Sequence, residues 1–332
     1  MLNESAKLNP QVFSDRVAKK PSRDGYGDGL VLAGEKNPNV VVLCADLSES
    51  TRAHLFAARF PERFFQLGVA EQNMATVAAG LGTSGKVVFI SSYATFSPGR
   101  NWEQIRTTIA YNNSNVKIAG HHAGISVGPD GATHQAVEDI ATMRVMANMR
   151  VFVPCDAIEA RKATLAAAHI MGPVYLRFTR EKTPLITTDE TPFVPGKAIT
   201  LYESKKPKVA IIGCGPILHN ALMAAYQLEN EGIGTMVINC HTVKPLDEVA
   251  VIAAAKKCGA VVTVEEHQIT GGLGGAVAEV LGRKLPTPME FVGMQDVYGQ
   301  SGSPDELMKE YGMDSPAIVK ACMKVLKRTG WR

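Results

Sequence analysis

The sequence lacks the features that mark secreted, membrane-spanning and nucleic-acid-binding proteins. Its six cysteines form no Cys-x-x-Cys pair and mostly lie in or beside apolar runs, which is typical of buried thiols in a reduced cytoplasmic protein and not of a disulfide framework. No apolar run approaches the length that a membrane-spanning helix requires. Residues 1–24 include acidic side chains and no long apolar stretch, so we expect no signal peptide. The net charge of +3 is small and dispersed, which indicates neither a nucleic-acid partner nor a membrane surface.

Short apolar runs alternate with amphipathic segments along nearly the whole chain. At 332 residues, 45% of them hydrophobic, the chain is long enough to form two cores. The strand-like runs are nearly continuous in apolar character, as expected where helices cover both faces of a parallel sheet, and they lie at 40–46, 86–91, 115–122, 150–155, 173–178, 207–215, 235–240, 261–266 and 289–294. Amphipathic helices are expected at 216–231, 245–258 and 315–328. This alternation predicts two doubly wound α/β domains with mostly parallel sheets.

A break in composition separates the two predicted domains. The segment TPLITTDETPFVPGKAI (183–199) holds three prolines and few large apolar residues, which is typical of a linker. We therefore predict a first domain at 21–185, a linker at 186–199 and a second domain at 200–332. Residues 1–20 are expected to form a lightly anchored N-terminal arm.

Two glycine-rich segments share the composition of phosphate-binding loops, and we interpret neither as one. GYGDG (25–29) follows a charged segment instead of a strand, and the asparagines at 37 and 39 come too early for a metal–diphosphate motif. We expect a helix start there. GGLGGAVAE (271–279) completes no GxGxxG pattern and has no acidic residue at the expected distance, so we expect a tight packing loop between a strand and a helix. The chain is thus predicted to lack a diphosphate-binding loop of its own.

A single carboxylate, Glu71, stands among apolar and small residues in FQLGVAEQNM (65–74). Met74, Val77, Ala78 and Leu81 recur at helical spacing, which predicts a helix that buries this face and carries Glu71 in its first turn. One interpretation is structural, because the positive end of a helix dipole stabilises a carboxylate. The other is functional, because a carboxyl group shielded from water can hydrogen-bond a ring nitrogen of a bound heterocycle. The segment alone supports both.

A glycine-rich segment, GHHAGISVGPDGATHQAVED (120–139), carries further polar side chains. His121 and His122 end a predicted strand, and Asp130 and His134 follow in the loop. Any one of these histidines alone would fit a loop or core position, but the group, at the carboxyl end of a parallel strand, predicts a ligand site. Metal binding is a competing interpretation and fits less well, because the spacing lies on a loop and not along one helix face.

Four segments together resemble the C-terminal section of transketolase. They are GVAEQNM (68–74), SSYATFSPGRNWEQIR (91–106), the GxSxGxDGxTHQ pattern within 124–135, and TVEEHQITGGLGG (263–275). The resemblance covers roughly residues 20–330, which would comprise the pyrimidine-binding and C-terminal domains of that family. The N-terminal domain, which in the family holds the diphosphate and Mg²⁺ with a GDG…N motif, has no counterpart here. The resemblance therefore implies one subunit of a split-gene transketolase.

The resemblance implies roles for Glu71 and for the aromatic segment. Glu71 would contact N1′ of the aminopyrimidine ring of thiamine diphosphate and favour the tautomer that takes a proton from C2 of the thiazolium. Phe96 would stack on the pyrimidine, with Tyr93 and Trp102 nearby, although by sequence alone these side chains fit core packing equally well. Asp46 would line the cofactor cleft near a neighbouring subunit.

The resemblance also assigns the substrate contacts. Asp130 would bind the C2 hydroxyl of the donor sugar, and His122 and His134 would contact substrate oxygens. Two positions depart from the family pattern: relatives commonly have a non-titrating residue at His121 and often an acidic one at Pro129. These departures leave the preferred substrate open.

A phosphate at the far end of the sugar would meet two cations and a hydroxyl group. By resemblance these are Arg180, Arg23 and Ser50, and the planar guanidinium suits bidentate phosphate contact. Arg23 also fits a solvated charge near a helix end.

The expected function is therefore ketol transfer by a two-subunit transketolase of the pentose phosphate pathway, from a ketose phosphate such as xylulose 5-phosphate to an aldose phosphate such as ribose 5-phosphate. We expect thiamine diphosphate, Mg²⁺ with its ligands on an N-terminal-section partner subunit, and an α2β2 assembly. The alternatives are a related thiamine diphosphate enzyme, whether 1-deoxyxylulose-5-phosphate synthase-like, E1-β-like or a transketolase variant for unusual sugars, and a non-catalytic scaffold. The DGATHQ loop and Arg180 favour transketolase over the first two, and the retained Glu71, Asp130 and His134 speak against a scaffold.

Overall fold

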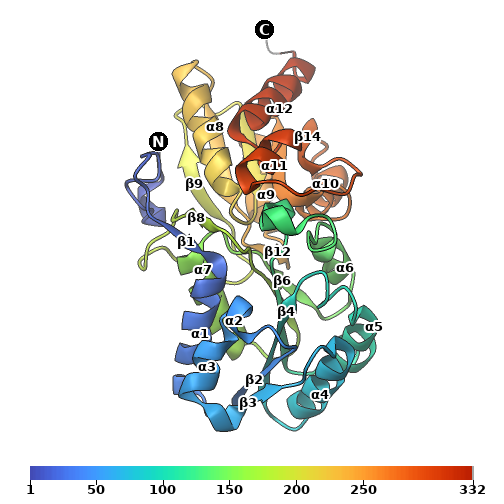
Figure 1. The fold of residues 1–332 in the computed structure, drawn as a ribbon. Helices are drawn as coiled ribbons and strands as arrows, with labels where there is room; N and C mark the ends of the chain where they lie inside the picture. Colours follow the sequence, from blue (N-terminus) through green and yellow to red (C-terminus); the bar gives the residue numbers. More distant parts are fainter. Residues whose placement is uncertain (331–332) are drawn as a thin grey trace.

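Two largely parallel β-sheets organise the chain, and each predicted apolar run contributes a strand to one of them (Figure 1). The structure is a computed structural model that describes residues 1–330, so Trp331 and Arg332, the end of the second predicted domain, lie outside the described residues. The predicted fold class, two doubly wound α/β domains, is confirmed. Within residues 1–330, the helices are too short or too polar to cross a bilayer.

The first sheet has the strand order β12-β6-β7-β5-β4-β2-β3, and its pairings are parallel except that of β12 with β6. Its strands are β2 (Val40–Cys44), β3 (Phe64–Gln66), β4 (Val87–Tyr93), β5 (Val116–His121), β6 (Arg150–Phe152), β7 (Val174–Arg177) and β12 (Thr242–Lys244). The helices around it are α1 (Ser22–Lys36), α2 (Ser48–Thr51), α3 (Ala53–Arg59), α4 (Glu71–Thr83), α5 (Trp102–Gln104), α6 (Asp139–Arg144) and α7 (Ala157–His169). Apolar side chains of α1, α3 and α7 cover one face, and those of α4 and α6 cover the other.

The second sheet has the order β14-β13-β10-β11-β9, with β9 antiparallel at one edge. Its strands are β9 (Ile199–Glu203), β10 (Val209–Gly213), β11 (Thr235–Asn239), β13 (Val261–Gln268) and β14 (Met289–Met294). Its helices are α8 (Leu218–Asn230), α9 (Glu248–Cys258), α10 (Leu273–Lys284), α11 (Pro304–Glu310) and α12 (Ser315–Arg328), which include the three helices predicted from amphipathic segments. The side chains of α8 and α12 pack on one face of the sheet, and those of α9 and α10 on the other.

Helix α4 begins at Glu71 as predicted, and it buries the predicted Met74 and Ala78, with Leu81 packed against the same core. Val77 is 38% exposed, whereas Ala75 and Gly82 lie against the sheet. The approach is close enough that a Cβ atom at Gly82 would lie 2.5 Å from the Ser114 hydroxyl. Small residues therefore extend the buried face away from Val77, the one predicted position that the structure leaves exposed.

The N-terminal arm is packed on the second domain, which differs from the predicted light anchoring. The Met1 carbonyl accepts a hydrogen bond from the amide of Glu203, and the amide of Asn3 donates to the Leu201 carbonyl at 2.9 Å. Val12 is fully buried in the apolar core of that domain. The arm then continues into β1 (Lys19–Pro21), which pairs with β8 (Lys182–Pro184). Isolated apolar residues such as Val12 gave no local pattern that would have indicated this packing.

The two domains share structure across their predicted boundary. Strand β12 belongs by sequence to the second domain but pairs with β6 of the first sheet, and one apolar cluster contains Met143 and Val151 of the first domain together with Val243 and Val277 of the second. The boundaries 21–185, 186–199 and 200–332 stay a prediction.

Both glycine-rich segments have the structural roles expected of them. GYGDG lies in the first turns of α1, where a Cβ atom at Gly25 would lie 1.9 Å from the Ala157 carbonyl oxygen, so the glycines allow α1 to pack closely on α7. In the second segment, the amides of Leu273 and Gly274 at the start of α10 both donate to the carboxylate of Glu265, at 2.7 Å each. This helix N-terminus is thus occupied by a side chain of the protein itself. The six cysteines are buried and unpaired with one another, as predicted.

Candidate active site

The predicted site residues gather at the carboxyl edge of the first sheet. Tyr93 ends β4 and pairs in register with His121, which ends β5. Glu71 opens α4 beside them, and the loop after β5 brings in Asp130 and His134. Side chains from separate strands meet here because parallel strands end at one edge of the sheet.

Glu71 is almost completely buried, with 1% of its surface exposed, as the sequence predicted. Its carboxylate oxygen Oε2 accepts a hydrogen bond from Nη1 of Arg100 at 2.8 Å, and the Ser92 hydroxyl approaches Oε1 at 3.4 Å. The Arg100 side chain is half-exposed, so it reaches the buried carboxylate from solvent. Arg100 lies in the aromatic segment 91–106, but no sequence pattern links it to Glu71, which is 29 positions away.

Four rings form a cluster next to this ion pair. The Tyr93 ring centroid lies 3.9 Å from that of His122 and 5.9 Å from that of Phe96, and the Phe96 and His134 centroids are 5.5 Å apart. The guanidinium of Arg100 lies over the Phe96 ring, 5.1 Å from its centroid. Arg100 therefore bridges the carboxylate of Glu71 and the face of an aromatic ring.

Trp102 lies outside this ring cluster. Its indole N–H donates to the Thr142 carbonyl at 3.1 Å, and its ring packs against the apolar core between α4 and α6. Of the three aromatic residues singled out from the sequence, Tyr93 and Phe96 share the environment of Glu71.

His121 and His122 have opposite environments although they are adjacent. His122 has a positive φ of 52° and turns toward Tyr93, while the fully buried His121 packs between Tyr26 and Phe178 in the domain core. Burial, followed by the positive charges of Arg23 and Arg180, lowers the pKa of His122 to about 3. His122 is therefore an uncharged imidazole near neutral pH, and its buried Nδ1 has no hydrogen-bond partner among the described residues.

Asp130 and Arg180 form an ion pair in this site. Nη1 of Arg180 donates to Oδ1 of Asp130 at 3.1 Å and to the Val127 carbonyl at 3.0 Å. Gly128 and Gly131, with φ of 81° and 75°, make the left-handed turns that place Asp130 between them. The His134 ring nitrogen Nδ1 lies 2.9 Å from the Thr133 hydroxyl.

Arg23, Ser50 and Asp46 lie on the neighbouring helix and strand ends. Nη1 of Arg23 donates to the backbone carbonyl of Ser50 at 3.0 Å, so these two residues contact each other directly. Asp46 follows β2 with a φ of 58°, and its amide donates to the side chain of Gln66 at 2.8 Å. The positive charges of Arg23 and Arg180 both lower the pKa of His122, so both guanidinium groups lie near its ring.

A network of buried polar side chains anchors the loop that carries Asp130 and His134. Asp139 accepts hydrogen bonds from Tyr175 at 2.6 Å and from Arg177 at 2.8 Å, and all three side chains are buried. Arg177 also donates to the backbone carbonyls of Ala136 and Glu266, which ties the loop to the second domain. His267 Nε2 accepts a hydrogen bond from the Ala141 amide. Within residues 1–330, no three His, Cys, Asp or Glu side chains are grouped closely enough to hold a metal ion.

Comparisons with known proteins give a consistent assignment. The sequence profile of the transketolase pyrimidine-binding domain matches residues 18–185, and that of the transketolase C-terminal domain matches 196–318. A Methanocaldococcus jannaschii protein with the name "transketolase C-terminal section" is 46% identical over 93% of this chain and 97% of its own length. A 6-deoxy-6-sulfo-D-fructose transketolase subunit from a Clostridium species is 38% identical over 97% of this chain and 99% of its own length.

The structural comparison agrees with the sequence comparison. A solved structure described as a split-gene transketolase, inactive beta4 tetramer, superposes with a TM-score of 0.86 at 46% identity, covering 92% of this chain and 98% of that one. By contrast, this chain spans only about half the length, 49%, of the transketolase of Rattus norvegicus.

Proposed function

Because the chain belongs to the transketolase family, we propose that it is the catalytic-base subunit of a split, thiamine diphosphate-dependent transketolase that transfers a two-carbon ketol unit between sugar phosphates. The observation that carries the proposal is the buried Glu71 carboxylate, which lies beside aromatic rings and is held by one displaceable partner. Ketol transfer by this family would require the aminopyrimidine ring of thiamine diphosphate to bind beside this carboxylate.

The contacts of Arg100 support the fit of an aminopyrimidine. The guanidinium is planar, donates to Glu71 and lies over Phe96, and a planar heterocycle with a protonated ring nitrogen would take the same two contacts. When bound, thiamine diphosphate supplies the nucleophilic carbon that ketol transfer needs. Glu71 would hold a shared proton at the ring nitrogen, Phe96 and Tyr93 would flank the ring, and Arg100 would turn toward solvent.

The loop residues are suited to handling a ketose. His122 is neutral near pH 7, so its ring can accept a proton or a hydrogen bond from a sugar hydroxyl. The His134 ring lies 5.5 Å from that of Phe96, centroid to centroid, and would contact substrate oxygens, while Asp130 would bind a hydroxyl group of the donor. Arg180, whose present partner is the half-exposed Asp130, would meet the sugar phosphate together with Arg23 and Ser50.

The proposed partner corresponds to the part of a full-length transketolase that the match to this chain does not cover. The chain corresponds to half of a full-length transketolase, and its two glycine-rich segments are occupied by helix packing and by Glu265. We infer that an N-terminal-section subunit holds the diphosphate and Mg²⁺, and that two copies of each subunit assemble as α2β2. The solved split-gene relative, described as an inactive tetramer of β-chains, supports the dependence on a partner.

Reconstitution tests the proposal. The chain is mixed with a candidate N-terminal subunit, thiamine diphosphate and Mg²⁺, and assayed with xylulose 5-phosphate and ribose 5-phosphate. Activity from the mixture and from neither subunit alone is expected. Stable assembly without turnover on any ketose would favour a scaffold instead.

A second candidate has the same chemistry on another ketose. The Clostridium relative, named for a sulfonated fructose, matches nearly its whole length to this chain. In the reconstituted assay, a kcat/KM for 6-deoxy-6-sulfofructose above that for xylulose 5-phosphate would assign this function.

A further inference from the structure

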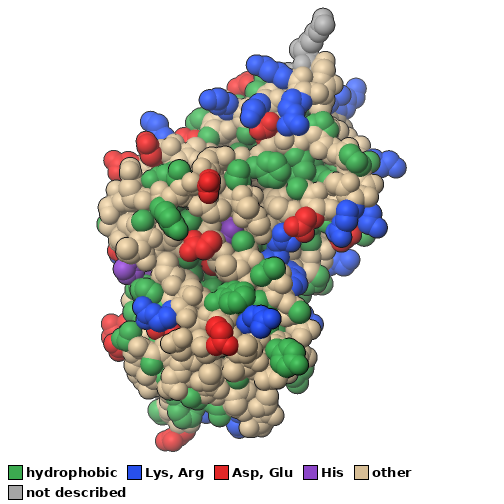
Figure 2. Space-filling view, turned by 90° about the vertical axis from the view of Figure 1, so that its right-hand side faces the viewer, with side chains coloured by type: hydrophobic (Ala, Val, Ile, Leu, Met, Phe, Trp, Pro, Cys, Tyr) green, Lys and Arg blue, Asp and Glu red, His purple; other side chains and the backbone are tan. Residues whose placement is uncertain are grey.

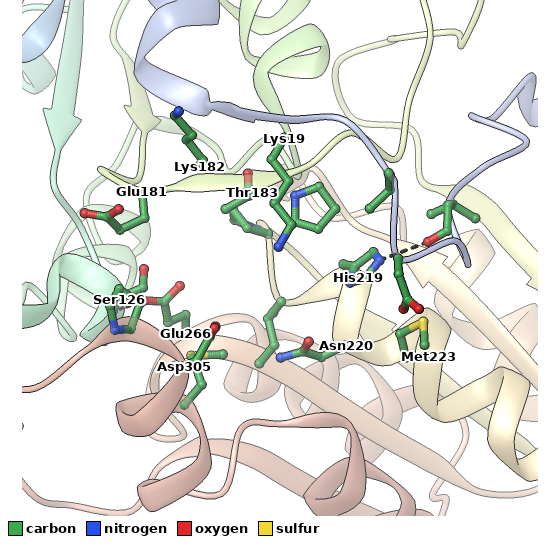
Figure 3. A pocket seen from close by; sticks show the side chains of 18 of the residues that line it. Lys19, Ser126, Glu181, Lys182, Thr183, His219, Asn220, Met223, Glu266 and Asp305 are labelled. Carbon is green, nitrogen blue, oxygen red and sulfur yellow. Dashed lines mark hydrogen bonds between the residues drawn. The ribbon is translucent and has the colours of Figure 1, made fainter.

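A cavity lies where the N-terminal arm, the segment after β7, α8 and α11 meet, and it borders the candidate active site at Ser126 and Glu181 (Figure 3). Its volume of about 350 Å³ is in the range of small-molecule sites. Met223 and Met308 contribute apolar wall, and charged side chains enter from two sides.

Glu266 supplies a buried carboxylate at the base of the cavity. Its side chain is only 4% exposed, and its oxygen Oε1 accepts a hydrogen bond from the Ser126 amide at 2.6 Å. The second oxygen accepts no hydrogen bond from the described residues, and the side chain lines the cavity. Burial raises the pKa of Glu266, and the nearby positive charge of Arg177 partly offsets this effect. A cation at the second oxygen would further stabilise the ionised form.

Acidic and basic side chains line the cavity from different sides. Figure 3 shows the carboxylates of Glu266 and Asp305 on one side and the amine of Lys19 on another, while the Lys182 amine turns away. Glu181 and Asp15 add two further carboxylates to the lining. His219 lines the cavity from α8, and its Nε2 lies 3.0 Å from the Val12 carbonyl oxygen, to which it donates a hydrogen bond. Burial lowers the pKa of His219, so the imidazole adds no charge.

We infer that this cavity binds a small zwitterion, with an ammonium group at Glu266 and Asp305 and an acidic group at Lys19. A single-charge ligand would leave one of the two walls unpaired. The apolar wall formed by Met223 and Met308 accommodates a short hydrocarbon chain between the two charged ends. The inference is independent of the proposed ketol transfer, because it concerns binding to this chain alone.

Calorimetric titration of the isolated full-length chain tests the site. The probes are ω-amino acids of increasing length, from glycine through 4-aminobutyrate to 6-aminohexanoate, each compared with the amine and the carboxylate of the same chain length. We expect at least one amino acid to bind about 10-fold more tightly than both of its single-charge counterparts, because it makes one more charge-assisted contact than either of them.

Three variants and a control locate the binding. Glu266→Gln keeps the acceptor for Ser126 but removes the charge, and should weaken amino acid binding about 10- to 100-fold. Lys19→Met and the exposed Asp305→Asn should each weaken it by a smaller factor, and neither residue is buried in the fold. Lys205→Met, an exposed lysine outside the cavity, should bind like the parent chain.

Two results would overturn the inference. One is that no amino acid in the series binds more tightly than its amine and its carboxylate. The other is that Lys19→Met and Asp305→Asn bind the best probe as tightly as the parent chain does. The second result is decisive even if Glu266→Gln fails to fold.

Discussion

Glu71 and Glu265 are both carboxylates at a helix N-terminus with 1% of their surface exposed, yet they have different partners. Glu265 accepts two backbone amides at the start of α10, at 2.7 Å each. Glu71, in the first turn of α4, has the side chain of Arg100 at 2.8 Å and a long contact to Ser92 at 3.4 Å. Backbone donors are fixed by the fold, whereas a half-exposed arginine side chain can rotate away.

This difference separates a structural carboxylate from one that is free to take a ligand. The helix dipole favours a carboxylate at both positions, so sequence position and burial do not distinguish them. The partner does, because only Glu71 can exchange its main contact without breaking backbone structure. On the face shown in Figure 2, charged side chains of both signs are scattered. The Arg100–Glu71 pair is distinguished by the burial of its acid, whose side chain is 1% exposed.

The largest expected effect comes from removing the exchangeable carboxylate. Glu71→Ala should lower kcat of the reconstituted enzyme by about 10²–10⁴-fold, the usual contribution of a positioned acid or base, while the isolated chain keeps its fold. Steady-state assays and circular dichroism measure the two properties. Glu71→Gln, which keeps the shape, should be nearly as inactive, and an Ala variant that retains turnover would refute the assigned role.

The reverse pattern is expected for Glu265→Ala. Two buried amides would lose their acceptor at a cost of about 1–3 kcal/mol each, so the free energy of unfolding should fall by about 2–6 kcal/mol. Urea unfolding measures this loss. Residual folded enzyme should keep its kcat, and a selective loss of turnover without destabilisation would remove the contrast with Glu71.

The fold was largely predictable from the sequence because its strands are continuous apolar runs. Each run gave a strand, and α12 begins and ends where its amphipathic segment predicted. Short elements that depend on distant partners were missed: β12 has three residues and pairs with β6 of the other domain, and Val12 finds its apolar surroundings in the second domain.

The sequence indicated most of the residues that gather at the site, but not how their side chains are arranged and paired. His122 and Asp130 lie near each other in sequence and were grouped correctly at one sheet edge, whereas His121 belongs to the core, because adjacent residues at a strand end point to opposite faces. Trp102 packs away from the rings, and Arg100 was unrecognised as a partner of Glu71. Side-chain pairing across distant segments has no local sequence signal. The catalytic and binding roles stay predictions.

Arg180, like Glu71, is paired with a side chain that a ligand could displace, in this case Asp130. Arg180→Ala should raise KM for phosphorylated sugars about 10- to 100-fold, as expected for loss of a charge-assisted phosphate contact. An unphosphorylated donor such as hydroxypyruvate serves as the control and should show little change. Equal effects on both donors would contradict phosphate binding.

The smallest expected effect concerns Arg100 itself. Arg100→Met should destabilise the isolated chain by about 1 kcal/mol, because Glu71 loses its main partner while the arginine side chain was half-exposed. In the assembled complex with thiamine diphosphate this loss should disappear, because the cofactor ring would replace the guanidinium. Thermal unfolding of both samples measures the difference. A loss of equal size in the two samples would mean that Arg100 stays on Glu71.

A structure of the assembled complex with thiamine diphosphate tests the central claim most directly. The account predicts the Glu71 carboxylate within about 2.6–3.2 Å of the ring nitrogen N1′, Arg100 turned away, and the diphosphate held by the other subunit. A complex in which Arg100 still contacts Glu71 and the ring binds elsewhere, or in which this chain alone encloses the cofactor, would contradict it.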